Sequence, residues 1–143
     1  MQERMRTHQL GKDQIDALLA RAQTGCLSCL NEDNTPYATP IHFLYDDGAV
    51  FFHCRQKGKR MENLKRNPNL CLSVYEMDGL LMDSEGAPCN TNTKYQSVLL
   101  NGRASAVEEF AEKEKILRKI VHKYTPHLAE NPMEEKMVKA TAV

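Results

Sequence analysis

Apolar residues near the start of the chain recur at helical spacing. Ile15, Leu18 and Leu19 fall on one helical face, between Gly11, which can cap a helix start, and Gly25, which ends the segment. This pattern predicts a short leading helix.

Strand-like runs rich in apolar residues follow this helix, with turn-forming residues between them. The runs cover 26–31, 36–45 and 49–55, and their spacing predicts a meander of three antiparallel strands. The pair Asp47-Gly48 stands between the second and third runs and is typical of a two-residue hairpin turn.

The middle of the chain alternates between strand and loop patterns. A two-turn helix is expected from Met61 to the stop at Asn67-Pro68, and a central strand over 70–75. Residues 76–93 hold four acidic and no basic residues, and their Gly, Pro and Asn content predicts a long loop. A long strand over 94–107 should follow, with Gly102 as a bulge or bend.

The last part of the chain returns to helical spacing. Residues 108–124 predict an amphipathic helix, and a second short helix is expected from about Pro132 to Val138. Residues 140–143 resemble the opening of one more strand. With 143 residues and no linker or repeat, residues 1–143 are expected to form a single domain.

Composition excludes several classes of protein. Apolar residues make up 41% and charged residues 27% of the chain, and 19 basic residues balance 19 acidic ones. No overall positive field therefore draws it to nucleic acid or to an anionic membrane. The N-terminus, Met1 to Thr7, is polar, and no apolar run is long enough to cross a bilayer, so we expect a cytoplasmic protein.

The five cysteines are an odd number for a disulfide framework, and we expect free thiols. Cys26 and Cys29 spell C-x-x-C, but they lie in a strand-like run and are expected to be packing residues. His42 and His53 with Cys54 and Cys71 lack a metal-binding spacing, so no metal site is predicted.

The densest charge cluster is the segment 55–66, with six basic residues and one acidic residue. It stands where a strand hands over to a helix, and a helix start with nearby cations can bind a phosphate. An ordinary solvated basic turn is the alternative. His53 and His42 are either structural or proton-transferring residues.

Five short motifs follow one order along the chain. They are PIHFLYDDG at 40–48, VFFHC at 50–54, GKR at 58–60, NP at 67–68 and YQSV at 95–98. This series resembles the flavin-binding split-barrel superfamily of pyridoxamine 5'-phosphate oxidase, and in particular its nitroimidazole-resistance branch. The resemblance implies an α+β fold with a mainly antiparallel six-stranded split β-barrel and flanking helices. It also implies a homodimer with one FMN in each of two clefts between the subunits.

The resemblance also assigns the residues of the flavin site. These are Thr39, Pro40, Ile41 and His42 along the ring edge, His53 and Cys54 at the next strand end, Lys59 and Arg60 at the phosphate, and Gln96 and Ser97 facing the ring. His53 matches a histidine that the branch places close to the flavin, and we expect it to orient a substrate or pass a proton.

The implied function is an FMN-dependent oxidoreductase that takes electrons from a donor and reduces a small electron-poor molecule, such as a nitroaromatic or nitroimidazole compound. A non-catalytic flavin- or heme-binding protein for redox storage or sensing is the alternative. Nucleic-acid binding through 55–66 is disfavoured because no aromatic residues interleave with the cations. The Arg and Lys of a true pyridoxamine phosphate oxidase are missing from the strand 38–43, so that reaction is not expected.

Overall fold

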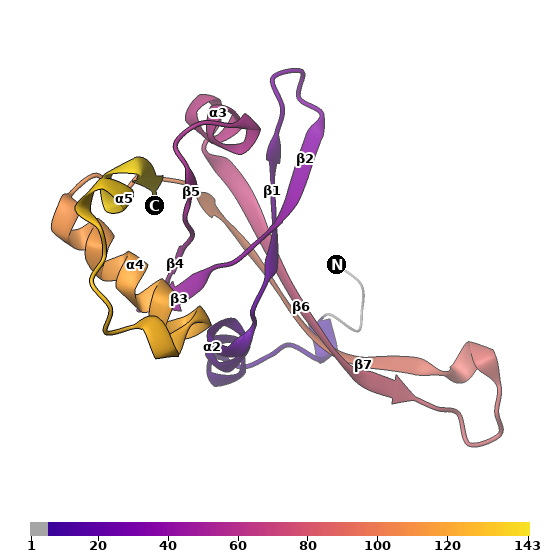
Figure 1. Ribbon diagram of the computed structural model, residues 1–143. Helices are drawn as coiled ribbons and strands as arrows, with labels where there is room; N and C mark the ends of the chain where they lie inside the picture. The colour runs from indigo at the N-terminus through magenta and orange to yellow at the C-terminus, as the bar shows by residue number, and fades with distance from the viewer. Residues whose placement is uncertain (1–5) are drawn as a thin grey trace.

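A four-stranded antiparallel sheet forms the centre of the computed structural model, which describes residues 6–143 (Figure 1). The strand order is β2-β1-β6-β7. The bounds are β1 (Gly25–Leu30), β2 (Pro36–Ile41), β6 (Asn69–Leu81) and β7 (Asn92–Arg103). Residues 1–5 of the polar N-terminal stretch lie outside the described residues.

Two small strand pairs complete the β-structure of the described chain. They are β3 (Leu44–Asp46) with β4 (Ala49–Phe51), and β5 (Cys54–Arg55) with β8 (Thr141–Ala142). The mixed α+β class with antiparallel sheets is therefore confirmed, whereas six strands in one barrel are not, because the main sheet has four. The expected opening of a further strand at the C-terminus is β8.

The predicted three-strand meander is interrupted within its second strand, 36–45. The end of α4 (Phe110–Tyr124) binds the backbone of that strand there. The break falls at His42 and Phe43, where the Phe43 N–H donates to the Tyr124 hydroxyl at 2.9 Å instead of to a neighbouring strand. The predicted turn is confirmed: Asp47 and Gly48 have φ of 48° and 77°, the left-handed pair that a tight hairpin between β3 and β4 requires.

The four α-helices of the described residues agree with the predicted ones. They are α2 (Lys12–Arg21), α3 (Lys59–Arg66), α4 (Phe110–Tyr124) and α5 (Glu135–Ala140), and short 3₁₀ turns lie at Pro88–Asn90 and Pro126–Leu128. Gln14 Oε1 accepts a hydrogen bond from the Gly11 N–H at 2.9 Å and so caps α2. Within residues 6–143, no helix is long and apolar enough to cross a bilayer.

One face of the sheet is buried and the other is bare. Leu27, Leu72 and Val74 point into a core shared with α2 and α3, and a second cluster joins β3 to α4 and α5. The residues that alternate with these along the strands point to the opposite face of the sheet. On that face, Tyr75 and Leu99 are 54% and 57% exposed. We call this bare side, which carries the odd-numbered residues of β6 before its bulge, the outer face.

The predicted loop over 76–93 is too long, because 76–81 and 92–93 belong to two paired strands and only 82–91 connect them. β6 and β7 run past the rest of the sheet as a two-stranded ribbon, the arm, which spans residues 77–95 and projects from the molecule in Figure 1. The bulge lies between Met77 and Gly79 rather than at Gly102, which pairs in register with Leu70. Gly79 has a φ of 135°, which residues with a side chain rarely adopt.

Gly25 is the glycine at which added bulk should disturb the sheet most. A Cβ there would lie 2.8 Å from Leu72 Cδ1 and 3.2 Å from the Ser73 carbonyl oxygen. Gly25→Ala should lower the free energy of unfolding by about 1–3 kcal/mol, measured by urea denaturation. Gly102→Ala is the matched control because nothing lies within 4 Å of its Cβ position, and a change below about 0.5 kcal/mol is expected. An equal loss of unfolding free energy in Gly25→Ala and Gly102→Ala would contradict the close packing at Gly25.

Candidate flavin site

Arg60 offers the clearest anion-binding group at the start of α3. Its Nε–H is buried and has no hydrogen-bond partner within residues 6–143, and its guanidinium stands over the Phe52 ring at 5.5 Å. A buried donor without a partner costs free energy unless a ligand accepts from it. Arg60 is therefore placed to receive an anion.

The backbone before Arg60 adds further donors. Gly58 precedes α3 with a φ of 133°, a conformation that favours glycine, and no side chain caps the helix start. The first N–H groups of α3 therefore have no capping partner among the described residues, and the helix dipole is positive there. Together with Arg60, this turn has the chemistry of a phosphate-binding site.

His53 lies beside this turn, close to His42 and Arg60. Burial lowers the pKa of His53 below its ordinary value, and the nearby His42 and Arg60 lower the pKa further. His53 is therefore neutral at pH 7, although its side chain is exposed enough to meet a ligand. The structure thus brings the two histidines and Arg60 together from three separate segments of the chain.

Tyr124, at the end of α4, fixes the position of His42. The Tyr124 hydroxyl accepts from the Phe43 N–H, and it lies 2.7 Å from the Phe43 carbonyl oxygen and 2.9 Å from that of Gln23, one of which takes its proton. The His42 and Tyr124 rings are 4.7 Å apart. This ring contact holds His42 at the break between β2 and β3, next to the candidate site.

Lys123 supports the same break from the neighbouring position of α4. Its ammonium group donates to the Phe43 carbonyl oxygen at 3.0 Å and stands 4.4 Å from the centre of the Phe43 ring. Burial lowers the pKa of Lys123. Neither Lys123 nor Tyr124 was predicted for the site, because nothing in the sequence marks the end of a helix as the partner of a strand 80 residues earlier.

Lys59 faces a different part of the surface from Arg60. It lines a shallow depression with Asn31, Glu32 and Asp33 at the β1–β2 turn. Hydrogen bonds from Thr35 lower the pKa of Asp33, and the charge of Lys59 lowers it further. The two cations predicted to grip one phosphate therefore have different neighbours, Asp33 for Lys59 and Phe52 for Arg60.

Gln96 and Ser97 are also separated from the histidine cluster. They lie on β7, and two strands, β1 and β6, separate β7 from β2. Gln96 Oε1 accepts from Arg21 at 2.7 Å, and Arg21 also pairs with Glu76 at 2.8 Å. Ser97 pairs in register with Tyr75 on the outer face. One chain thus places the two groups of predicted site residues on opposite edges of its sheet.

The remaining predicted residues lie along the β2 and β5 strands. Ile41 is buried in the core, Pro40 is exposed and pairs with Cys26, and half-buried Thr39 pairs with Leu27. Half-buried Cys54 pairs with Ala142 of β8.

The five cysteines are free thiols, as expected, and no metal-binding group of three or more His, Cys, Asp or Glu occurs in the described part of the chain.

The chain belongs to the pyridoxamine 5'-phosphate oxidase family, whose model matches residues 11–143. This family is one of flavin-binding split barrels, which confirms the resemblance. Among curated proteins, none matches the sequence.

Solved structures share the fold of this chain at low sequence identity. The flavocytochrome Anf3 from Azotobacter vinelandii is 24% identical with a TM-score of 0.85, over 99% of this chain and 65% of that one. A protein from Bacteroides thetaiotaomicron described as one of 5-nitroimidazole antibiotic resistance is 21% identical with a TM-score of 0.76, over 92% and 76%. The FAD and heme binding protein from Mycobacterium smegmatis is 19% identical with a TM-score of 0.81, over 92% and 63%. This chain therefore spans less than two thirds of the length of the first and third.

Proposed function

We propose that this protein is an FMN-dependent oxidoreductase that reduces small electron-poor molecules of the nitroaromatic or nitroimidazole type. The observation that carries the proposal is the buried Arg60 Nε–H without a partner in the described chain, beside a histidine at the mouth of a cationic turn. Membership of a flavin-binding family supports the flavin phosphate as the ligand of this anion site. A nitroimidazole-resistance protein and an F420 reductase among the structures of similar fold favour a reductase.

In the proposed site, Arg60 and the free N–H groups at the start of α3 hold the phosphate of the cofactor. Thr39, Pro40, Ile41 and His42 follow the ring edge, with Cys54 at the adjacent strand end. A bound flavin supplies the hydride or electrons. His53 orients the substrate or passes a proton, because its exposed imidazole lies beside Arg60 at this turn.

The proposal includes a homodimer with the cofactor between the subunits. Gln96 and Ser97 are on the opposite edge of the sheet from His42, so a second copy is the simplest source of these groups for the same flavin. The outer face supports this arrangement, since large exposed apolar faces mark protein interfaces. Tyr75, Met77 and Leu99 are each more than half exposed on it.

Heme binding is the second candidate function. Two of the structures of similar fold are of a flavocytochrome and a FAD and heme binding protein, and the exposed His42 and His53 carry imidazoles that can coordinate iron. A redox storage or sensing protein would use these histidines as ligands rather than as proton donors. The absorption spectrum of the heme-loaded wild-type protein, compared with the spectra of heme-loaded His42→Gln and His53→Gln, separates the two roles.

Replacement of Arg60 should weaken flavin binding more than replacement of its neighbour. Arg60→Gln is expected to raise the FMN dissociation constant about tenfold or more, because a charged hydrogen bond to the phosphate is lost. Lys59→Gln is the matched control. It should change the FMN dissociation constant about threefold or less, since Lys59 faces Asp33 at the surface. Quenching of FMN fluorescence measures both. If Lys59→Gln has the larger effect, the phosphate lies at the β1–β2 turn instead.

His53→Gln should leave the flavin bound and slow the reaction with substrate. With the flavin photoreduced without oxygen, reoxidation by a 5-nitroimidazole is expected to slow by about 100-fold. Because the pKa of His53 is lowered, its protonated form grows as pH falls below neutrality. The wild-type rate should therefore rise toward acid pH, whereas the variant rate stays level. An unchanged rate and pH profile would exclude His53 from the reaction.

A further inference from the structure

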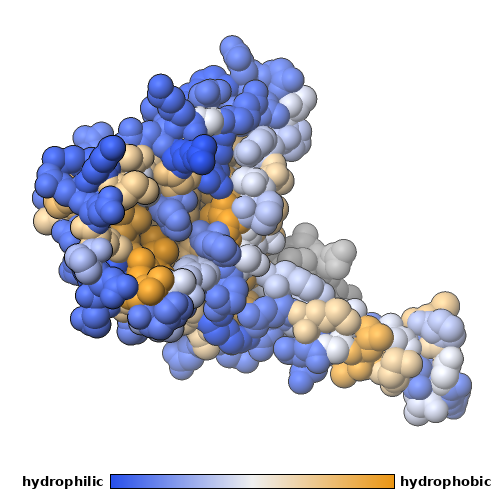
Figure 2. Space-filling model, viewed as in Figure 1, coloured by the Kyte–Doolittle hydropathy of each residue, from blue (hydrophilic) through white to orange (hydrophobic). Residues whose placement is uncertain are grey.

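The apolar row of the outer face continues along the arm beyond the sheet. Tyr75 and Met77 on β6 and Tyr95 on β7 share this face, and the Tyr75 and Tyr95 rings are 5.5 Å apart. All three are about half exposed. Apolar residues (orange) are visible along the arm in Figure 2. A two-stranded ribbon is marginal in water unless something covers it, so this row needs a partner.

The bulge in β6 keeps this row on one face. Without it, the strict alternation of a strand would turn Leu80 toward the other side. The extra residue, Asp78, shifts the pairing so that Leu80 stands opposite Thr93, on the side of Tyr95, while Leu81 stands opposite Asn92 on the reverse side. The row of Tyr75, Met77 and Leu80 is therefore continuous from the sheet into the arm.

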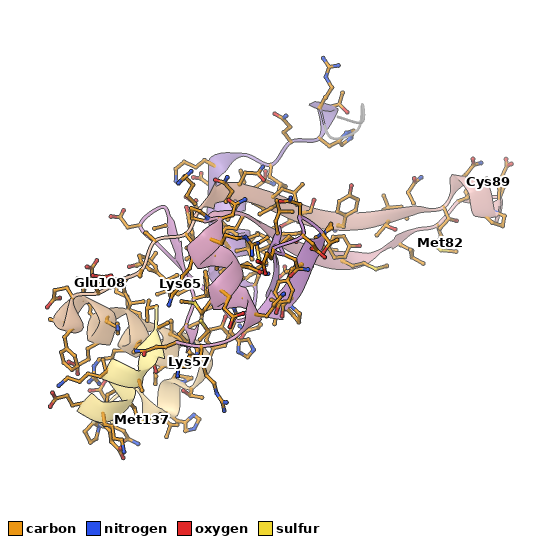
Figure 3. All side chains as sticks on the ribbon, turned by 90° about the horizontal axis from the view of Figure 1, so that it is seen from above. Lys57, Lys65, Met82, Cys89, Glu108 and Met137 are labelled. Atoms are coloured by element: carbon orange, nitrogen blue, oxygen red, sulfur yellow. The ribbon has the colours of Figure 1, made fainter. Side chains whose placement is uncertain are left out.

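Charge is divided between the two ends of β6. The arm carries Asp78, Asp83 and Glu85 against one cation, Lys94. The basic segment 55–66 leads directly into β6 at its other end. Figure 3 shows Lys57 and Lys65 far from Met82 and Cys89 at the arm. Because β6 has 13 residues, about 40 Å of strand separates these ends, and they cannot meet within one chain.

We propose that the arm of each chain packs on a second copy and lies along that copy's basic segment, beside its flavin phosphate site. This inference rests on the proposed homodimer and adds which elements meet in it. A two-fold axis through the outer face and perpendicular to β6 runs the two β6 strands in opposite directions. Each acidic arm then reaches the other copy's basic segment, while Tyr75, Met77 and Leu80 are covered.

A charge exchange between two variants tests the contact directly. The arm variant carries Asp78→Lys and Glu85→Lys, and the segment variant carries Lys57→Glu and Lys65→Glu. Lys57 adjoins Gly58 at the proposed phosphate turn, so FMN binding of each variant is measured alongside its dimerisation. Each variant alone places like charges together twice in its homodimer, so its dimer dissociation constant in sedimentation equilibrium should rise about tenfold or more at low salt. A mixture of the two restores both contacts, and heterodimers should dominate in native mass spectrometry.

Leu80 and Leu81 give a second, matched test of the apolar row. They are neighbours of nearly equal exposure, 56% and 54%, on opposite faces of the same ribbon. Leu80→Glu should weaken the dimer, whereas Leu81→Glu should leave it unchanged. Circular dichroism of each variant verifies that the sheet is intact. Equal effects of the two substitutions would contradict the assignment of the outer side of the arm to the interface.

The outcomes separate this inference from the proposed function. If both charge variants form dimers with wild-type affinity and bind FMN, the arm contact is wrong and the flavin dimer stands. The arm contact is also wrong if the mixture of the two variants shows no preference for the heterodimer. If the wild-type chain sediments as a single copy at every concentration, the homodimer itself is wrong, and the arm contact fails with it.

Discussion

The unequal covering of the two faces of the four-stranded sheet is the constraint on which the rest of the structure depends. On one face, Leu27, Leu72 and Val74 are buried against α2 and α3. On the other, Tyr75 and Leu99 remain exposed, although apolar side chains of that size gain free energy when water leaves them. The chain therefore has a packed core, but apolar residues on one face of its sheet are left exposed to water. The proposed dimer follows from that exposure.

The candidate site depends on a second constraint, a positively charged group whose N–H has no acceptor in the described structure. The cluster around Arg60 contains a buried N–H without a partner in the described structure and a histidine whose pKa is lowered by burial and by the nearby His42 and Arg60. An anion at this position would satisfy the donor and offset the Arg60 charge, which adds to burial in lowering the pKa of His53. Binding of a phosphate-bearing cofactor and uptake of a proton by His53 are therefore coupled in the proposed mechanism.

Local chemistry was enough to predict much of this fold. The helix between Gly11 and Gly25 and the Asp47-Gly48 hairpin follow from backbone preferences that act within a few residues. The arm was missed because acidic residues and glycines at 76–93 are typical of loops, whereas its pairing depends on a second strand farther along the chain. Its bulge was misplaced at Gly102 for the same reason, since the two strands stay in register there.

The candidate site was predicted only in part. His42, His53 and Arg60, which the motif order groups together, lie close in space. Lys59, however, turns toward Asp33, because consecutive residues at a helix start point in different directions. Tyr124 could not be foreseen, since its hydroxyl serves a backbone amide 81 residues earlier in the chain. Contacts of this kind are set by the packing of α4 on β3 and leave no local pattern.

Sedimentation of the protein with FMN, followed at the blue absorption band of the flavin, tests the central claim most directly. The account predicts that the flavin absorbance moves with a species of twice the chain mass and that one flavin is bound per chain. Flavin that sediments with a single chain would contradict the shared site. A protein that takes up no flavin at any concentration would contradict the proposed function as a whole.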